Sequence, residues 1–257
     1  MKDFFSLIYG FLLKEFYIEK SYKLSFLFKV ITTIFQLLIF YFLCKIISSD
    51  YFKFLFIGIL FSRSMHYTFT SLNEVIRQEQ HWGTIETLVL LPYNEITIFI
   101  SAVIAKYIFL YFEIIFYLII ASFLGANFNI FQVIIIYLVL TFFNILFLCF
   151  GLLISSATLL TRKMESLSWL VLSLIDLLSG VYFSPTQLPQ ILYKISLLLP
   201  TTTALSFFRS TMDKNLPLGL NSLLTSILWS LLFYPIAIFL FSFVLKTSLR
   251  KGSLENY

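Results

Sequence analysis

Long apolar runs separated by short polar segments make up most of the chain. A transmembrane helix needs about 17–25 predominantly apolar residues, and six runs meet that length. The six predicted transmembrane helices cover residues 24–44, 52–72, 96–124, 130–160, 167–183 and 222–245. Residues 1–22 instead mix charged and apolar side chains, which is typical of a helix lying in the membrane interface. The pattern predicts an all-α integral membrane protein with a single transmembrane domain over residues 1–257.

The polar segment 73–94 lies between the second and third apolar runs. Gly83 is expected to end one helix, because glycine tolerates the left-handed conformation found at helix C-termini. Thr84 is a suitable N-cap for a second helix, Glu86 would lie in its first turn, and Pro92 would stop it. We therefore predict a short, interrupted amphipathic helix at the membrane surface, which suits docking better than catalysis.

A proline-rich segment, residues 184–217, separates the fifth and sixth runs. It is largely apolar, but only about 15 residues lie between Pro185 and Pro200, with Pro189 between them, so it is too short to span a bilayer. A re-entrant or interfacial hairpin on the external side fits this length. An apolar loop resting on lipid headgroups is the alternative.

Composition and charge agree with a membrane protein. The chain is 60% hydrophobic and 12% charged, with a mean hydropathy of +0.94, whereas soluble domains are about a quarter charged. Ten Lys and Arg residues flank one side of the predicted helices and five flank the other. The positive-inside rule then places both termini and segment 73–94 in the cytoplasm. The net charge of +5 is therefore explained by membrane orientation and does not indicate nucleic-acid binding. We expect the protein to lie in a bacterial cytoplasmic membrane, with lipid as a partner.

Several ionisable residues fall inside the predicted spans, where each costs a few kcal/mol unless it finds a partner or water. Lys29 lies near an inner edge, and four others lie deeper. Depths along the helices, at about 1.5 Å per residue, predict two interhelical pairs: Arg63 with Glu113, and Lys106 with Asp176.

Arg63, His66, Thr70 and Asn73 recur at helical spacing and give the second span one polar stripe. Such a stripe faces a bundle interior or a cavity rather than lipid. Structural pairing and direct substrate contact are both open for these residues. His66 and His81 are too far apart to share an ion, so we predict no metal site.

No G-x-x-x-x-G-K-[ST] phosphate loop for a nucleotide occurs in the sequence. The hydrolase motifs H-E-x-x-H and G-x-S-x-G are absent as well. Any ATP chemistry must come from another polypeptide. One stretch of the sequence resembles the coupling region of type-2 ABC exporter permeases. It reads Glu79-Gln80-His81-Trp82-Gly83-Thr84-Ile85-Glu86-Thr87-Leu88 and is closed by Leu91-Pro92. Segment 180–185 and the prolines after it are similar to that family's stretch between spans five and six. Residues 1–22 are similar to the family's connecting helix.

The resemblance implies a non-catalytic permease with six spans that forms a homo- or heterodimer and docks two cytoplasmic ABC ATPase subunits. ATP and Mg would bind the ATPases, and this chain would bind no cofactor. By position, the ATPase-docking residues would be Arg77, Glu79, Gly83, Thr84 and Glu86. The family more often has a charged residue where this chain has His81-Trp82.

The predicted function is export of an amphipathic or hydrophobic substrate, such as a drug, a lipid-linked glycan or a peptide. A proton-coupled secondary transporter using Arg63, Glu113 and Asp176 is one alternative, although the chain has no inverted repeat. A membrane-embedded enzyme is the other.

Overall fold

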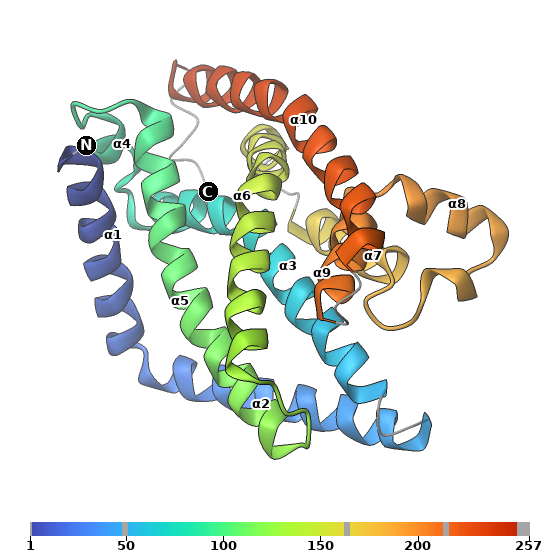
Figure 1. Ribbon diagram of the computed structural model, residues 1–257. Coiled ribbons are helices and arrows are strands. Elements are labelled where there is room, and N and C mark those ends of the chain that lie inside the picture. The colour runs from blue at the N-terminus through green and yellow to red at the C-terminus, as the bar shows by residue number, and fades with distance from the viewer. Residues whose placement is uncertain (1, 48–50, 162–164, 213–215, 251–257) are drawn as a thin grey trace.

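The computed structural model describes residues 2–47, 51–161, 165–212 and 216–250 (Figure 1). This part of the chain is helical and contains no strand, so the predicted all-α class is confirmed. The helices are α1 (Lys2–Ser21), α2 (Lys23–Ile47), α3 (Tyr51–Trp82), α4 (Ile85–Val89), α5 (Glu95–Phe123), α6 (Ile130–Thr161), α7 (Glu165–Ser179), η1 (Pro185–Gln187), α8 (Gln190–Leu198), α9 (Pro200–Met212) and α10 (Leu216–Arg250).

Helix α3 lies at the centre of the fold and packs against α2, α5, α6 and α9. Gly151 of α6 lets two helices approach closely, because a Cβ there would lie 2.6 Å from the Thr68 carbonyl oxygen. Beside this contact, the Asn144 side-chain oxygen accepts hydrogen bonds from the hydroxyls of Ser64 (2.7 Å) and Thr68 (2.9 Å). Small residues and interhelical hydrogen bonds of this kind hold helices together where apolar surroundings remove the hydrophobic driving force.

Four of the described helices contain segments long and apolar enough to cross a membrane: Lys23–Ile46, Glu95–Phe123, Ile130–Leu159 and Asn221–Ser248. A fifth results if α8 and α9 count as one broken span. Helix α3 is not among them despite its 32 residues, since Lys53, Arg63 and His66 lower the hydropathy of its N-terminal half. Six spans therefore remain a prediction.

Helix α7 ends at Ser179 rather than at the predicted residue 183. Its described apolar part, Trp169–Ser179, is short for a span. Gly180 turns the chain with a φ of +80°, a conformation that side chains with a Cβ rarely adopt. The chain then reaches the short helix η1.

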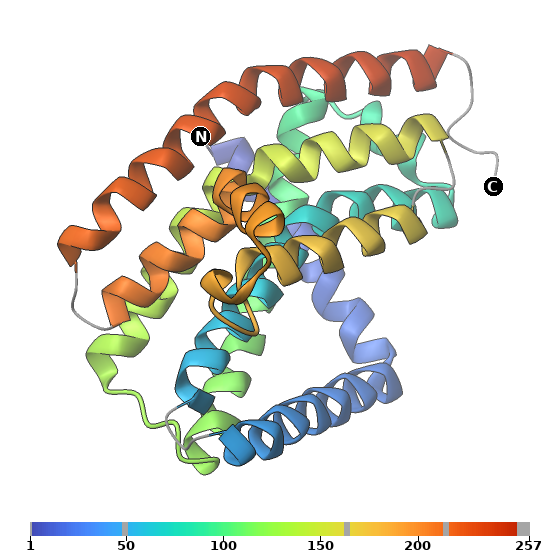
Figure 2. The ribbon, with the colours of Figure 1, turned by 90° about the vertical axis from the view of Figure 1, so that its right-hand side faces the viewer.

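Helices α3, α6 and α10 run in the same direction, with their N-terminal ends on the left in Figure 2 and their C-terminal ends on the right. This order agrees with the second, fourth and sixth predicted spans having one orientation. Helices α1 and α2 meet in a corner near Tyr22, with α1 lying alongside α5 (Figure 1). The placement of α1 in the membrane interface stays a prediction.

The proline-rich segment forms a bent helix pair, in which α8 and α9 differ in direction by 83°. Leu199 at the bend is extended (φ −76°, ψ 127°), because the ring of Pro200 disfavours helical geometry in the residue before it. Helix α9 packs mainly against α10 and also against α3, α6 and α7, whereas most of α8 is exposed. This is the geometry of a broken span or a re-entrant loop, so the re-entrant hairpin predicted for residues 184–217 stays a prediction.

Candidate functional site

The C-terminal end of α3 forms a sharp elbow at Gly83, which we call the coupling elbow (residues 79–84). Gly83 has a φ of +67°, and its N–H donates to the Gln80 carbonyl oxygen at 3.1 Å. The Thr84 N–H donates to the Glu79 carbonyl oxygen at 2.9 Å. These two bonds make a Schellman motif, in which a left-handed glycine satisfies the last carbonyls of a helix. The prediction for Gly83 is confirmed.

The short helix α4 follows the coupling elbow. Thr84 stands directly before it, and its carbonyl oxygen accepts the Leu88 N–H at 3.1 Å. Thr84 therefore stands at the predicted N-cap position of α4, and its hydroxyl donates to the Glu79 carboxylate. Helix α4 ends at Val89, three residues before Pro92. Glu86 lies in α4, but its side chain is outside the described part of the structure.

Glu79 is buried inside the elbow, with only 2% of its side chain exposed. Its carboxylate accepts hydrogen bonds from Lys14 Nζ of α1 and from the Thr84 hydroxyl. Lys14 also lies 4.9 Å from the ring centroid of Trp82, a cation–π distance. Burial lowers the pKa of Lys14, and the neighbouring Glu15 charge opposes that shift. Glu79 thus fixes the elbow to α1, and the surface that a partner could touch includes His81, Trp82 and Gly83.

A second ion-pair group joins α5 to the two helices of the first, α1 and α3. Lys106 of α5 lies 3.2 Å from Glu74 of α3 and 4.0 Å from Glu15 of α1. The predicted pairing of Lys106 with Asp176 is therefore wrong. Equal depth along two helices does not fix which way each side chain points, and the prediction had not considered α1 as a source of partners. Arg77, in the turn of α3 after Glu74, is half-buried.

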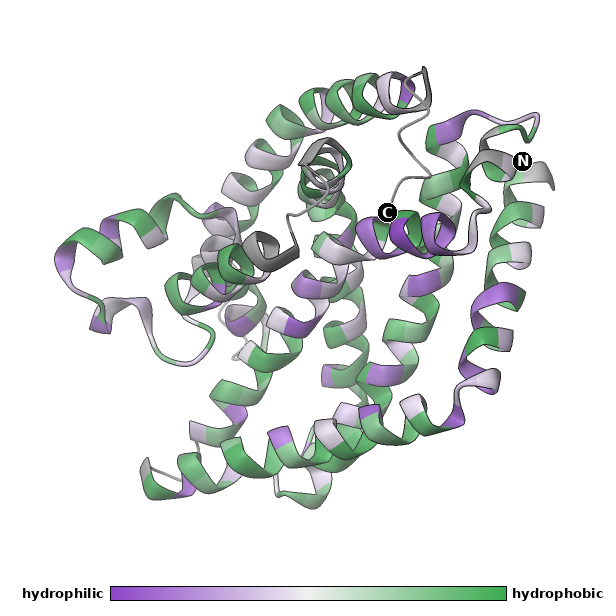
Figure 3. Ribbon diagram, turned by 180° about the vertical axis from the view of Figure 1, so that it is seen from behind, coloured by the Kyte–Doolittle hydropathy of each residue, from purple (hydrophilic) through white to green (hydrophobic). Residues whose placement is uncertain are grey.

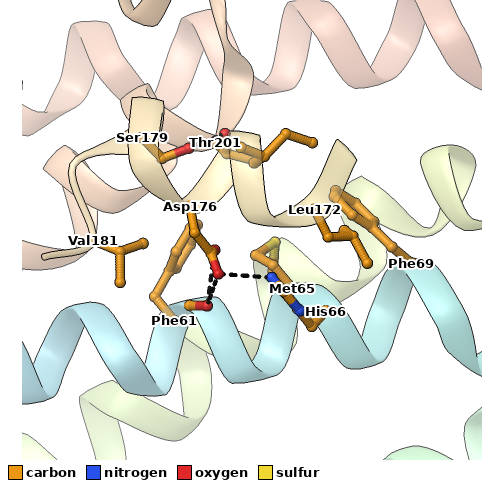
Figure 4. Close-up of a pocket in the computed structure, with 11 residues that line it drawn as sticks. Phe61, Met65, His66, Phe69, Leu172, Asp176, Ser179, Val181 and Thr201 are labelled. Carbon is orange, nitrogen blue, oxygen red and sulfur yellow. Dashed lines mark hydrogen bonds and ion pairs between the residues drawn. The ribbon is translucent and has the colours of Figure 1, made fainter. Parts of the chain in front are cut away.

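Asp176 of α7 instead contacts α3 (Figure 4). The Ser62 hydroxyl lies 2.8 Å from both carboxylate oxygens, and His66 Nε2 lies 2.8 Å from Oδ2. The His66 contact is at ion-pair distance without hydrogen-bond geometry. The cavity beside these groups measures about 10 Å³, which is room for a single water molecule. A substrate-sized molecule does not fit there in this conformation.

The predicted pair of Arg63 and Glu113 is present. Arg63 Nη2 lies 2.7 Å from Glu113 Oε1, and Arg63 Nε donates to the same oxygen at 2.9 Å. Lys29 of α2 joins them, with Nζ 3.5 Å from Glu113 Oε2. The sequence placed Lys29 near a membrane edge and gave no partner for it.

The polar stripe of α3 contacts more than one helix. Arg63 points to α5 and His66 to α7. Asn73 accepts a hydrogen bond from the Thr158 hydroxyl of α6 at 2.7 Å, and the Thr70 hydroxyl donates to the His66 carbonyl oxygen at 3.0 Å. Three residues of the stripe, Arg63, His66 and Asn73, therefore join α3 to three other helices.

Near the bent pair, Arg209 of α9 holds the turn that follows α7. Its guanidinium donates to the carbonyl oxygens of Gly180 (2.9 Å) and Val181 (3.1 Å) and lies 3.6 Å from the ring centroid of Phe54. Sequence reasoning missed this contact, because backbone carbonyls carry no sequence signal.

The three prolines of the predicted hairpin each stand at the start of a different helix. Pro185 packs beside Gly180 and begins η1, Pro189 directly precedes α8, and Pro200 begins α9. Pro200 stands at the first position of its helix, where proline's missing N–H costs nothing.

Comparison with protein families gives a match to the ABC-2 type transporters over residues 11–212. The chain belongs to this family. The match begins inside α1 and ends at the last residue of α9, so it includes both the coupling elbow and the bent helix pair. A comparison with curated proteins gives no match.

The protein is accordingly a multi-pass transmembrane permease of an ABC transporter, and its family generally lacks a catalytic site, dimerises and works with ABC ATPase subunits. In Figure 3 hydrophilic residues gather at the C-terminal end of the permease's α3 and interrupt otherwise hydrophobic helices. In the described residues these groups form ion pairs and hydrogen bonds between helices. The arrangement suits transmission of movement.

Proposed function

We propose that the permease is the membrane subunit of an ATP-driven exporter. It moves an amphipathic or hydrophobic substrate out of the cytoplasm or the inner leaflet of a bacterial cytoplasmic membrane. The segment 73–94 docks on a cytoplasmic ATPase, which binds ATP and Mg. The observation that carries this proposal is that α3 is one unbroken helix of 32 residues. It runs into the coupling elbow at its C-terminal end, and nearer its N-terminal end it packs against the turn held by Arg209.

In this mechanism, closure of two ATPases on ATP pushes the coupling elbows of a permease dimer. Lys14–Glu79 ties α1 to the elbow, and Lys106–Glu74 ties α5 to the same end of α3. The three helices therefore move together. At the other end, α3 packs against the turn after α7 and against α9, so the movement reaches the bent helix pair. ATP binding would then shift the connected helices α1, α3 and α5 from one arrangement to another. Coupling between two sites requires such a change between two states.

The experiment compares two glycines in liposomes that contain the permease and its ATPase. Gly83→Ala puts a Cβ on a residue with a φ of +67°, at a cost of about 1–2 kcal/mol. Gly10→Ala in α1 meets nothing within 4 Å and is the control. Gly83→Ala should lower ATP-driven transport about 5–30-fold while the protein inserts normally, and Gly10→Ala should not. Equal transport by both variants would contradict the docking role.

A proton-coupled transporter is the second candidate, and the contact of His66 with Asp176 between two helices favours it. Protonation of either group would change that contact. The two functions differ in their energy source. Collapse of transport by a proton ionophore at constant ATP would support the proton-coupled transporter, whereas collapse on ATP depletion with the proton gradient intact supports the exporter.

A further inference from the structure

Lys29, Arg63 and Glu113 form a charged cluster contributed by three helices, α2, α3 and α5. Lys29 and Glu113 both lie inside segments apolar enough to cross a membrane. The cluster holds two cations and one carboxylate, which leaves a net formal charge of +1. Among the described residues, no other acid contacts either cation.

The two cations are also the exposed members of the cluster. The side chains of Lys29 and Arg63 are 41% and 40% exposed, whereas Glu113 is 10% exposed. Arg63 directs Nε and Nη2 to a single Glu113 oxygen, which leaves its remaining N–H groups for another acceptor. Lys29 lies at the longer distance of 3.5 Å and is not saturated by the carboxylate. The cluster therefore presents donors and positive charge outward, with its acid behind them.

An uncompensated charge within a membrane costs several kcal/mol, so ionisable groups there take partners. A guanidinium and an ammonium side by side suit a phosphate group, because arginine bonds phosphate oxygens in a planar fork and lysine adds a mobile point charge. Glu113 fixes the position of Arg63 without neutralising both cations.

We propose that Lys29 and Arg63 bind the phosphate group of an anionic amphiphile, with Glu113 as the positioning residue. The amphiphile is either a phospholipid of the bilayer or a phosphate-bearing substrate, and both present the same headgroup chemistry. Helices α2, α3 and α5 meet at this site, so an occupant would lie where these three helices come together.

The test titrates the purified full-length permease in neutral detergent with a short-chain phosphatidylglycerol and, separately, a matched phosphatidylcholine, with native mass spectrometry as readout. Wild type should retain phosphatidylglycerol preferentially. Lys29→Gln leaves the neutral Arg63–Glu113 pair intact and should weaken that binding about fivefold, the effect of one basic residue near an anionic headgroup. Glu113→Gln keeps a side-chain oxygen that can accept from Arg63 but raises the cluster charge, so it should strengthen phosphatidylglycerol binding. Lys53→Gln, at the start of α3, is the control and should bind like wild type.

Inorganic phosphate distinguishes the sources. Phosphatidylglycerol that resists displacement by millimolar phosphate identifies a lipid-borne headgroup, and displacement identifies a site that takes the free anion. Equal binding of the two lipids by wild type, or equal phosphatidylglycerol binding by wild type and Lys29→Gln, overturns the proposal. Because no ATPase is present, this failure is separate from any failure of ATP-driven export.

Discussion

A carboxylate as deeply buried as that of Glu79 needs a counter-charge, and Lys14 provides it. Among the described residues, Lys14→Met would leave the Thr84 hydroxyl as the hydrogen-bond partner of the Glu79 carboxylate. Removing one member of a buried ion pair costs about 3–5 kcal/mol. We expect a loss at the low end, about 3 kcal/mol, because 26% of the Lys14 side chain is exposed and water reaches it. Denaturant unfolding of the purified permease measures this free energy.

The double variant Lys14→Met/Glu79→Gln separates charge from packing at the same site. It removes the buried charge together with its partner, so it should be more stable than Lys14→Met alone. Lys20→Met is the matched control, since Lys20 is exposed on the same helix, and should change stability by less than about 0.5 kcal/mol. A double variant as unstable as Lys14→Met would show that the ion pair is not what holds the elbow to α1.

At the scale of elements, one glycine sets how closely the turn after α7 approaches α3. A Cβ on Gly58 would overlap the Val181 carbonyl oxygen and lie 2.9 Å from Arg209 Nη2. The backbone of that turn would have to move away, with the loss of hydrogen bonds from Arg209. Gly58→Ala should therefore destabilise the permease by about 1–3 kcal/mol, the cost of overpacking. Thermal unfolding in detergent would show it, and an unchanged unfolding midpoint would contradict this role of Gly58.

The elements also show which features a sequence can reveal. The turn at Gly83 was predictable, because a left-handed glycine at a helix end acts through local backbone geometry. The Arg63–Glu113 pair followed from depth. Depth failed for Lys106, whose partners depend on helix rotation and on a helix outside the spans. Arg209 bonds backbone carbonyls, which every residue carries, so nothing in the sequence marks its acceptors.

At the scale of the whole molecule, the orientation of the permease decides whether the coupling elbow can meet an ATPase. Thr87 in α4 and Gln187 in η1 are both exposed, but they belong to the elbow side and the bent-pair side of the fold. The native Cys44 and Cys149 are free and buried, so introduced cysteines should give most of the thiol labelling. In intact cells, a membrane-impermeant maleimide should label Gln187→Cys and leave Thr87→Cys unlabelled. Permeabilised cells should show both labelled, because a reagent with access to both faces no longer separates them. Labelling of Thr87→Cys in intact cells would place the elbow outside, where no cytoplasmic ATPase could reach it, and proposed ATP-driven export would fail with it.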